Sequence, residues 1–292
     1  MNVRRLAAGG LTAFLVLGLT VVMAVGQPQQ PPIVAAFTAS KVPLDPGAAD
    51  AAFRQATPRA IPLVAQTLIK PFGGGTVKEI RVRALHDGRM AYFELTWADA
   101  TPDRGPLGPA GFTDAVALQF PMSTAPPLAS PLMGDRNRPV NIWQWKAAWQ
   151  DEVTRGRDLR AVYPHMFVDY YYDVQLAKTA RDREGFNAGV AAGNLLSRPR
   201  RTSAVEDLVA WGFGTVTTQP HQDVIGFGAW RSGRWTVVMA RPLVTSDEAD
   251  VRFAVGSRTL LNVAVWDGHQ RQRNGQKSVT LTWWPVEFAP RP

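Results

Sequence analysis

The sequence contains no cysteine among its 292 residues. That absence excludes disulfide bridges, cysteine-ligated zinc, iron–sulfur clusters, a cysteine nucleophile and cofactor attachment through a thioether. Charged residues are scarce at 19%, and neither a Gly-x-Ser-x-Gly elbow nor a lysine-bearing phosphate loop is present. A pair of catalytic carboxylates would leave no such signature, so an enzyme with its own active site stays a minor alternative.

What is present is a composition suited to many short strands. Hydrophobic residues make up 46% of the chain, with 10 Trp, 25 Gly and 23 Pro, which indicates a globular protein with a sizeable core and frequent turns. The net charge of +8 comes mainly from scattered arginines rather than from a basic stripe with interleaved aromatic residues. We therefore do not expect nucleic acid as a partner.

The N-terminus has the pattern of an export signal. Arg4 and Arg5 precede an apolar run over residues 6–25, and Ala24-Val25-Gly26 forms a small-x-small cleavage site. The sequence predicts a signal peptide over 1–26, with an uncleaved membrane anchor as the alternative. We expect a periplasmic domain, in contact with the membrane only through such an anchor.

The rest of the chain divides into an extended linker over 27–50, rich in Pro, Gln and Ala, and one domain over 51–290. Short alternating runs with turn residues between them predict a mainly β fold, an antiparallel β-sandwich with long loops and a few short helices. The expected strands are 76–85 and 89–97 around a turn at 86–88, 114–120, a hairpin over 226–241, 251–255, 260–266 and 277–284. Helical periodicity occurs only near 188–196.

Two residues are out of place on physical grounds, whereas the four histidines have the pattern of surface or loop residues. Lys277 falls on the apolar face of the last predicted strand, together with Val279, Leu281 and Trp283. Met133 lies in a Pro/Gly/Asp loop, where methionine is less expected than in a core. A lysine that snorkels to water and a methionine that plugs a gap are the alternative interpretations.

A set of motifs in fixed order resembles the gamma subunits of the ethylbenzene dehydrogenase and dimethylsulfide dehydrogenase type, whose relatives serve selenate and chlorate reductases. The resemblance covers roughly residues 50 to 285. The stretches that carry it are Ala84-Leu-His-Asp-Gly88, Trp97-Ala-Asp-Ala-Thr101, Asp114-Ala-Val-Ala-Leu-Gln-Phe-Pro121, Met133-Gly-Asp135, Pro139-Val-Asn-Ile-Trp-Gln-Trp-Lys-Ala147, Leu208-Val-Ala-Trp-Gly-Phe-Gly-Thr215, Gly233-Arg-Trp-Thr-Val-Val-Met-Ala-Arg241, Trp266-Asp-Gly268 and Arg273-Asn-Gly-Gln-Lys-Ser278.

The resemblance implies a β-sandwich that binds one haem b, with Met133 and Lys277 as axial iron ligands. Trp143, Trp145, Trp266 and Trp283 are candidates for walls of the porphyrin site, and Lys146 is the rival lysine, in a different motif. The implied role is electron transfer without catalysis by the chain alone. The implied partners are a molybdopterin-containing catalytic subunit, an iron–sulfur subunit and a soluble or quinone-linked electron carrier.

A second function class also fits a sandwich rich in aromatic residues. A non-haem, carbohydrate-binding-like module would hold its ligand against exposed tryptophans, and Met133 and Lys277 would then be incidental.

Overall fold

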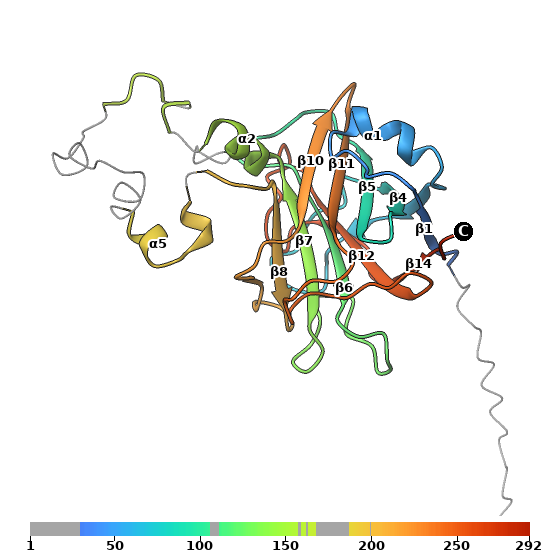
Figure 1. Cartoon of the computed structure of the whole chain (residues 1–292). Helices are drawn as coiled ribbons and strands as arrows, with labels where there is room; N and C mark the ends of the chain where they lie inside the picture. Colours follow the sequence, from blue (N-terminus) through green and yellow to red (C-terminus); the bar gives the residue numbers. More distant parts are fainter. Residues whose placement is uncertain (1–29, 106–110, 157–158, 162, 168–186, 199) are drawn as a thin grey trace, which may run out of the picture. The chain divides into compact units, whose positions relative to one another are not determined.

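The computed structural model describes residues 30–105, 111–156, 159–161, 163–167, 187–198 and 200–292 (Figure 1). The helices are α1 (Pro46–Phe53), α2 (Ala147–Arg155) and α5 (Ala188–Ala191), with 3-10 turns η1 (Leu159–Ala161) and η2 (Leu195–Ser197). The strands are β1 (Ile33–Phe37), β2 (Arg59–Pro62), β3 (Val64–Ala65), β4 (Glu79–His86), β5 (Met90–Ala98), β6 (Ala115–Pro121), β7 (Val140–Lys146), β8 (Val205–Ala210), β9 (Thr217–Thr218), β10 (Ile225–Trp230), β11 (Arg234–Pro242), β12 (Arg258–Trp266), β13 (Ser278–Val279) and β14 (Trp284–Phe288).

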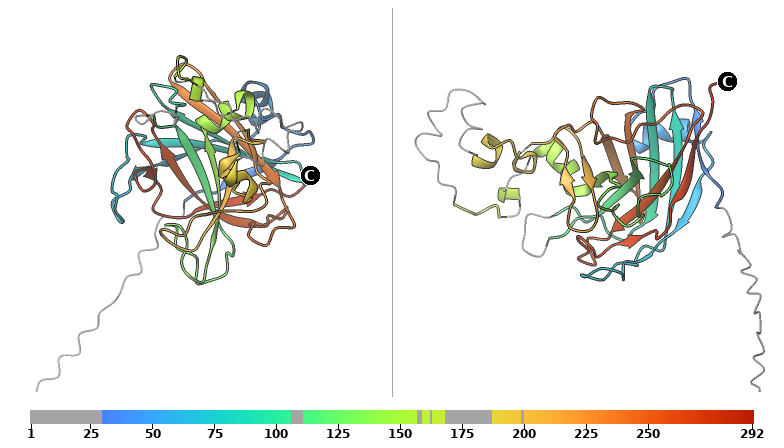
Figure 2. Two further views of the ribbon diagram at one scale, coloured as in Figure 1. Left: turned by 90° about the vertical axis from the view of Figure 1, so that its left-hand side faces the viewer. Right: turned by 90° about the horizontal axis from the view of Figure 1, so that it is seen from below.

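The strands form one continuous sheet in the order β10-β11-β5-β4-β1-β14-β12-β6-β7-β8-β9. The long strand β12 joins its two halves, because residues 258–261 pair with β14 and residues 262–266 pair with β6. The sheet bends there, so that β4, β5 and β11 form one layer and β6, β7 and β8 form another (Figure 2). The predicted sandwich is confirmed.

Aromatic side chains fill the space between the two layers. Phe93 of β5 packs against Phe120 of β6 and Trp143 of β7, with ring centroids 5.6 and 5.8 Å apart. Trp145 of β7 packs against Trp235 of β11 at 4.9 Å. Because side chains alternate across a strand, the neighbours of these residues on β6 and β7 point to the opposite, outer face. That outer face carries the site described below.

The hairpins were predictable from local sequence. The β4–β5 pair turns at residues 87–89, and the β10–β11 pair turns at 231–233, where Ser232 and Gly233 both have positive φ. Positive φ at adjacent turn residues matches the right-handed twist of the strands that they join.

The prediction of an extended linker over 27–50 was wrong for its described part. Residues 33–37 form β1, which pairs in parallel with both β4 and β14, and residues 46–53 form α1. The sheet is therefore mixed rather than purely antiparallel. The Pro-rich flanks concealed this strand, and its partners lie about 50 and 250 residues away along the chain, beyond the reach of local pattern.

Three other expectations also differ from the structure. The predicted last strand over 277–284 is interrupted, with β13 at 278–279 and β14 beginning at residue 284. Residues 251–255 form no strand. His86 is not a surface residue: it is fully buried between the rings of Phe37 and Phe288, and its Nε2 contacts the carbonyl oxygen of Ala289 at 2.8 Å.

The predicted export signal over 1–26 lies outside the described residues. Within the described ranges, every helix is too short or too polar to span a bilayer.

The outer face of the β4–β5–β11 layer is covered by α1 and the segment before it. Phe53 of α1 and Val42 pack with Leu85, Tyr92 and Val238 of this layer in one apolar cluster. The helix begins at Asp45, whose side chain accepts a hydrogen bond from the backbone N–H of Ala48. This packing closes one side of the sandwich, while no helix of the described residues lies over the outer face of β6, β7 and β12 (Figure 1).

A buried ion pair ties the layers together. Arg241 of β11 and Asp250 are both fully buried, with Nη1 and Oδ1 2.9 Å apart, and Arg241 also donates a hydrogen bond to Asn141 Oδ1 of β7 at 2.8 Å. The guanidinium carbon lies 4.9 Å from the centre of the Trp143 ring.

We predict that Arg241→Met lowers the free energy of unfolding by about 3–5 kcal/mol, because it leaves Asp250 buried and without its cation. The matched control is Arg258→Met, which removes an exposed pair with Glu287 and is expected to cost less than about 1 kcal/mol. Urea unfolding of the three proteins measures both values. Equal losses in the two variants would show that the buried pair does not support the core.

Candidate functional site

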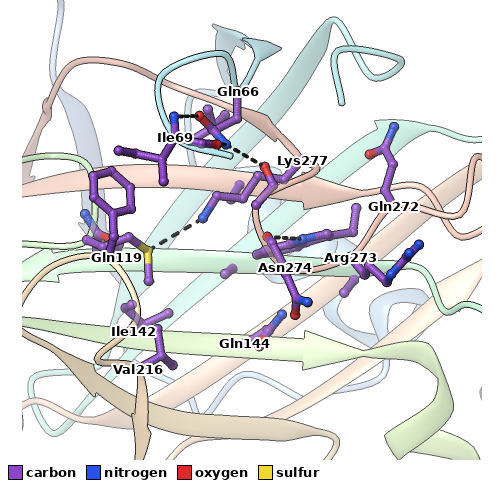
Figure 3. A pocket seen from close by; sticks show the side chains of 18 of the residues that line it. Gln66, Ile69, Gln119, Ile142, Gln144, Val216, Gln272, Arg273, Asn274 and Lys277 are labelled. Carbon is purple, nitrogen blue, oxygen red and sulfur yellow. Dashed lines mark hydrogen bonds between the residues drawn. The ribbon is translucent and has the colours of Figure 1, made fainter. Parts of the chain in front are cut away.

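The outer face of the second layer holds a cavity of about 660 Å³, within the size range of small-molecule and cofactor sites. Its floor consists of outward-facing residues of β6, β7 and β12. These are Ala115, Ala117, Gln119, Ile142, Gln144, Lys146, Asn262, Ala264 and Trp266. The three alanines leave the cavity open, because larger side chains at these positions would fill it. Loops near 66–71, 111–113, 131–133, 213–216 and 272–277 form its walls (Figure 3).

Met133 lies on one of these walls, in a loop that the sequence builds tightly. Its φ is +74°, a region that non-glycine residues seldom adopt and that costs about 1–3 kcal/mol. Gly134 follows with φ +73°, and a Cβ at this position would lie 2.8 Å from the carbonyl oxygen of Arg138. Asp135 fixes the loop by accepting hydrogen bonds from Arg138 Nε at 2.9 Å and from the backbone N–H of Ser130 at 3.3 Å.

Lys277 reaches the cavity from the opposite wall. Its carbonyl oxygen accepts a hydrogen bond from the backbone N–H of Gln66, and the next residue, Ser278, accepts one from the N–H of Gly75. Gly74 lies directly against this backbone: a Cβ there would come within 2.0 Å of the Lys277 carbonyl oxygen. The glycine run 73–75 thus allows close approach of the loop that holds Lys277 in place.

The two side chains meet inside the cavity. Lys277 Nζ lies 3.6 Å from Met133 Sδ and 5.2 Å from the centre of the Trp266 ring. The dashed line from Lys277 to the yellow sulfur atom in Figure 3 marks the first contact. No carboxylate among the described residues forms an ion pair with Lys277. Burial lowers the pKa of Lys277 to about 8, so a larger fraction of this amine is neutral at a given pH than in a free lysine.

Lys146, the rival lysine, lines the same cavity but has a different environment. Its Nζ forms a short ion pair with Glu206, which is buried, and lies 4.1 Å from the centre of the Trp149 ring. Burial lowers the pKa of Lys146, and the Glu206 carboxylate opposes that shift. A carboxylate partner holds the proton on this amine, so of the two lysines Lys277 is the one without a counter-charge among the described residues.

Trp143 and Trp145 do not lie at this cavity. Both are fully buried between the layers, on the inner face of β7, whereas Ile142, Gln144 and Lys146 face the cavity. Alternation along the strand puts the two tryptophans on the side opposite Met133 and Lys277. We therefore do not retain them as cofactor-site residues. Of the four candidate tryptophans, Trp266 lines the cavity.

Sequence reasoning missed the residues that create the space. Ala115 and Ala117 alternate with Val116 and Leu118 on β6, and Ala264 lies between Val263 and Val265 on β12. A small residue at every second position of a buried strand was the available signal, because such a face leaves room for something other than protein.

We predict that Lys277→Met stabilises the ligand-free protein at neutral pH, because it removes a buried cation that has no counter-charge among the described residues. The pKa is about 8 folded and 10.5 unfolded, so from pH 8 to 10.5 the unfolded chain binds more protons and wild-type stability rises with pH. Urea unfolding across this range is expected to show that the difference in free energy of unfolding between the variant and the wild type becomes smaller as the pH rises. A wild type that is the more stable at neutral pH, or a gap independent of pH, would contradict the assignment of Lys277 as a buried cation without a counter-charge.

The chain is similar to solved carbohydrate-binding structures only at the level of a remote likeness. A family 9 carbohydrate-binding module of Caldicellulosiruptor kristjanssonii, solved with cellotriose, aligns over 90% of this chain and 95% of its own with 7% identity and a TM-score of 0.41. A likeness this low carries no argument about function.

Sequence comparison gives closer relatives. A protein of Haloferax mediterranei named as a respiratory nitrate reductase heme subunit is 28% identical over 98% of this chain and 85% of its own. The chlorate reductase gamma subunit of Ideonella dechloratans is 25% identical over 74% of this chain and 67% of its own. The dimethylsulfide dehydrogenase gamma subunit of Rhodovulum sulfidophilum is 27% identical, over 70% and 59% respectively.

The sequence model described as ethylbenzene dehydrogenase matches residues 50–278, more than three quarters of the chain. This match confirms the resemblance that the ordered motifs indicated. The protein belongs to the ethylbenzene dehydrogenase family.

Proposed function

We propose that the chain is an exported electron-transfer subunit that binds one haem b in the cavity, with Met133 and Lys277 as the axial ligands. The observation that carries the proposal is the 3.6 Å contact, at a cavity, between a thioether and a lysine amine with no counter-charge among the described residues. The family membership supports it, and so does the name of the Haloferax relative, which is a heme subunit.

The residues present fit such a group. Transition-metal bonds to nitrogen and sulfur are roughly 2.0 and 2.3 Å, as for zinc, so one ion between two such atoms needs them about 4.3 Å apart. The observed 3.6 Å is slightly shorter, and both side chains have rotatable bonds that allow the difference. The small alanine side chains of the floor leave space for a bound group, and Arg273 at the wall offers a cation to carboxylate groups of a ligand.

Each ligand has a distinct chemical contribution. A free lysine titrates near ~10.4, so its deprotonation at neutral pH costs about 4–5 kcal/mol before it can bind a metal. The cavity reduces that cost by burying the Lys277 ammonium without a carboxylate. Met133 carries no proton, and its soft sulfur favours the ferrous state and raises the reduction potential.

Held by Met133 and Lys277, the haem would supply a one-electron couple and would have no open position on the iron for a substrate. That chemistry suits a relay subunit rather than a catalyst. We propose that the chain works in a complex with a molybdopterin-containing catalytic subunit and an iron–sulfur subunit, and exchanges electrons with a soluble or quinone-linked carrier. The gamma-subunit names of the two bacterial relatives support this assignment, as does the N-terminal pattern for export to the periplasm.

The structure gives the carbohydrate-binding alternative little support. Such a module needs tryptophans on its surface, and of the ten in the chain only Trp211 is exposed. Met133 and Lys277, incidental on that hypothesis, instead face each other across the cavity.

We predict that the full chain loaded with haem has a six-coordinate low-spin visible spectrum, and that Met133→Ala and Lys277→Ala each convert it to high spin or release the haem. Removing a ligand is expected to weaken haem binding by more than the roughly 10–100-fold typical of losing an outer-shell partner. Titration with haem, followed by visible absorption, measures both effects.

The matched controls are Lys70→Ala, the third lysine that lines the cavity, and Met166→Ala, a methionine outside it. Both are expected to keep the low-spin spectrum. A wild type that does not bind haem would overturn the proposed function, and unchanged spectra in both ligand variants would overturn the ligand assignment.

A third substitution tests the role of the sulfur. We predict that Met133→His keeps a low-spin haem but lowers its reduction potential, because imidazole lacks the preference of a thioether for ferrous iron. Spectroelectrochemical titration of variant and wild type measures the change. A potential equal to or above that of the wild type would show that Met133 does not set it.

A further inference from the structure

Three carboxylates from separate strands meet at one end of the sandwich. Asp99 follows β5, Asp114 precedes β6 and Asp267 follows β12, and each offers an oxygen within 4.8 Å of the other two. Asp99 and Asp114 are buried, and Asp267 is half-buried. The bend between the layers brings these strand ends together, so the cluster is a product of the fold and not of one loop.

Asp114 accepts hydrogen bonds from three N–H donors. Its Oδ1 accepts a hydrogen bond from the backbone of Gly268 at 2.8 Å, and its Oδ2 accepts from the backbone of Asp103 at 2.7 Å and from Trp235 Nε1 at 2.9 Å. Three donors occupy three of the roughly four acceptor sites of the carboxylate and leave one site free for a cation.

Asp99 has an oxygen without a hydrogen-bond partner among the described residues. Its Oδ1 accepts a hydrogen bond from the backbone of Thr101 at 3.1 Å, while its Oδ2 is buried and accepts none. The indole N–H of Trp97 lies beside this carboxyl group but is not in hydrogen-bonding geometry with it. A buried carboxylate oxygen in this condition needs a donor or a cation, because leaving it unpaired is costly.

No basic side chain in the described part of the chain neutralises the cluster. None of the ion pairs found there includes Asp99, Asp114 or Asp267. Three ionised carboxylates at this separation repel one another unless a cation or a proton lies between them.

We propose that Asp99, Asp114 and Asp267 bind a calcium ion. Calcium takes hard oxygen ligands in a flexible geometry, and carboxylates from three strand ends supply that type of ligand, with water and backbone carbonyls available to complete the shell. Gly268 is part of the site, since a Cβ there would lie 2.7 Å from Asp103 and prevent the close approach.

The ion would fix one end of the segment that carries the proposed haem ligand. That segment runs from Asp267 to Lys277, and its residues 272–275 line the cavity. The proposal does not depend on haem, because the three carboxylates lie outside the cavity lining.

Thermal unfolding of the full chain without haem, after treatment with a chelator, tests the site. Calcium at about a hundred times its Kd is expected to raise the Tm by roughly 5–10 °C. Isothermal titration with calcium should give one binding event per chain. Magnesium at the same concentration is expected to raise the Tm less, because it demands a stricter geometry and gives up its water reluctantly.

The diagnostic variant is Asp99→Asn, which keeps the shape but removes one charge. It is expected to abolish the calcium response and, in chelator, to melt at or above the wild-type temperature because the repulsion is reduced. The matched control, Glu248→Gln, makes the same change at an exposed carboxylate and should respond to calcium as the wild type does.

An absent calcium response in the wild type, an undiminished response in Asp99→Asn, or an equal response to magnesium would each overturn the proposal. Because this assay contains no haem, its failure would leave the proposed electron-transfer function standing.

Discussion

An amine without a counter-charge among the described residues faces a thioether at the cavity of this protein. Lys277 Nζ has the Met133 sulfur at 3.6 Å and the Trp266 ring at 5.2 Å, and no acid in the described ranges pairs with it. A cation in such a place destabilises the protein unless it loses its proton or finds a ligand. The nearby Lys146–Glu206 pair shows the ordinary solution, whereas the environment of Lys277 favours the neutral amine.

The surrounding backbone enforces this contact at some expense in stability. Met133 is held in a left-handed conformation, and Gly134 follows in a space that admits no side chain. On the other wall, the absence of a side chain at Gly74 lets the loop that holds Lys277 close against it. Backbone strain of this kind persists only where the rest of the structure over-determines it, and it is concentrated at functional sites. The sheet supplies that rigidity, with its aromatic core on one face and the alanine floor on the other.

Local sequence predicted what depends on neighbours in the chain. The hairpins followed from turn residues, and Met133 and Lys277 were anomalous in their own segments before any partner was known. The predictions that failed depend on tertiary structure. β1 pairs in parallel with strands that are far away in the sequence. Trp143 faces the core because the inner face of β7 packs into the main hydrophobic cluster between the layers. Alternation showed that β7 has two faces but not which one borders the cavity. The alternation of side chains also continues without a break through residues 280–283, so it did not predict the interruption between β13 and β14.

The central claim is that the Met133 sulfur and the Lys277 nitrogen bind the same iron atom. X-ray absorption at the iron edge of the haem-loaded chain tests it most directly, because sulfur scatters differently from nitrogen in the first coordination shell. We predict one sulfur neighbour of iron in the wild type and in Lys70→Ala, and none in Met133→Ala. A first shell of nitrogen and oxygen alone in the wild-type protein would contradict the claim.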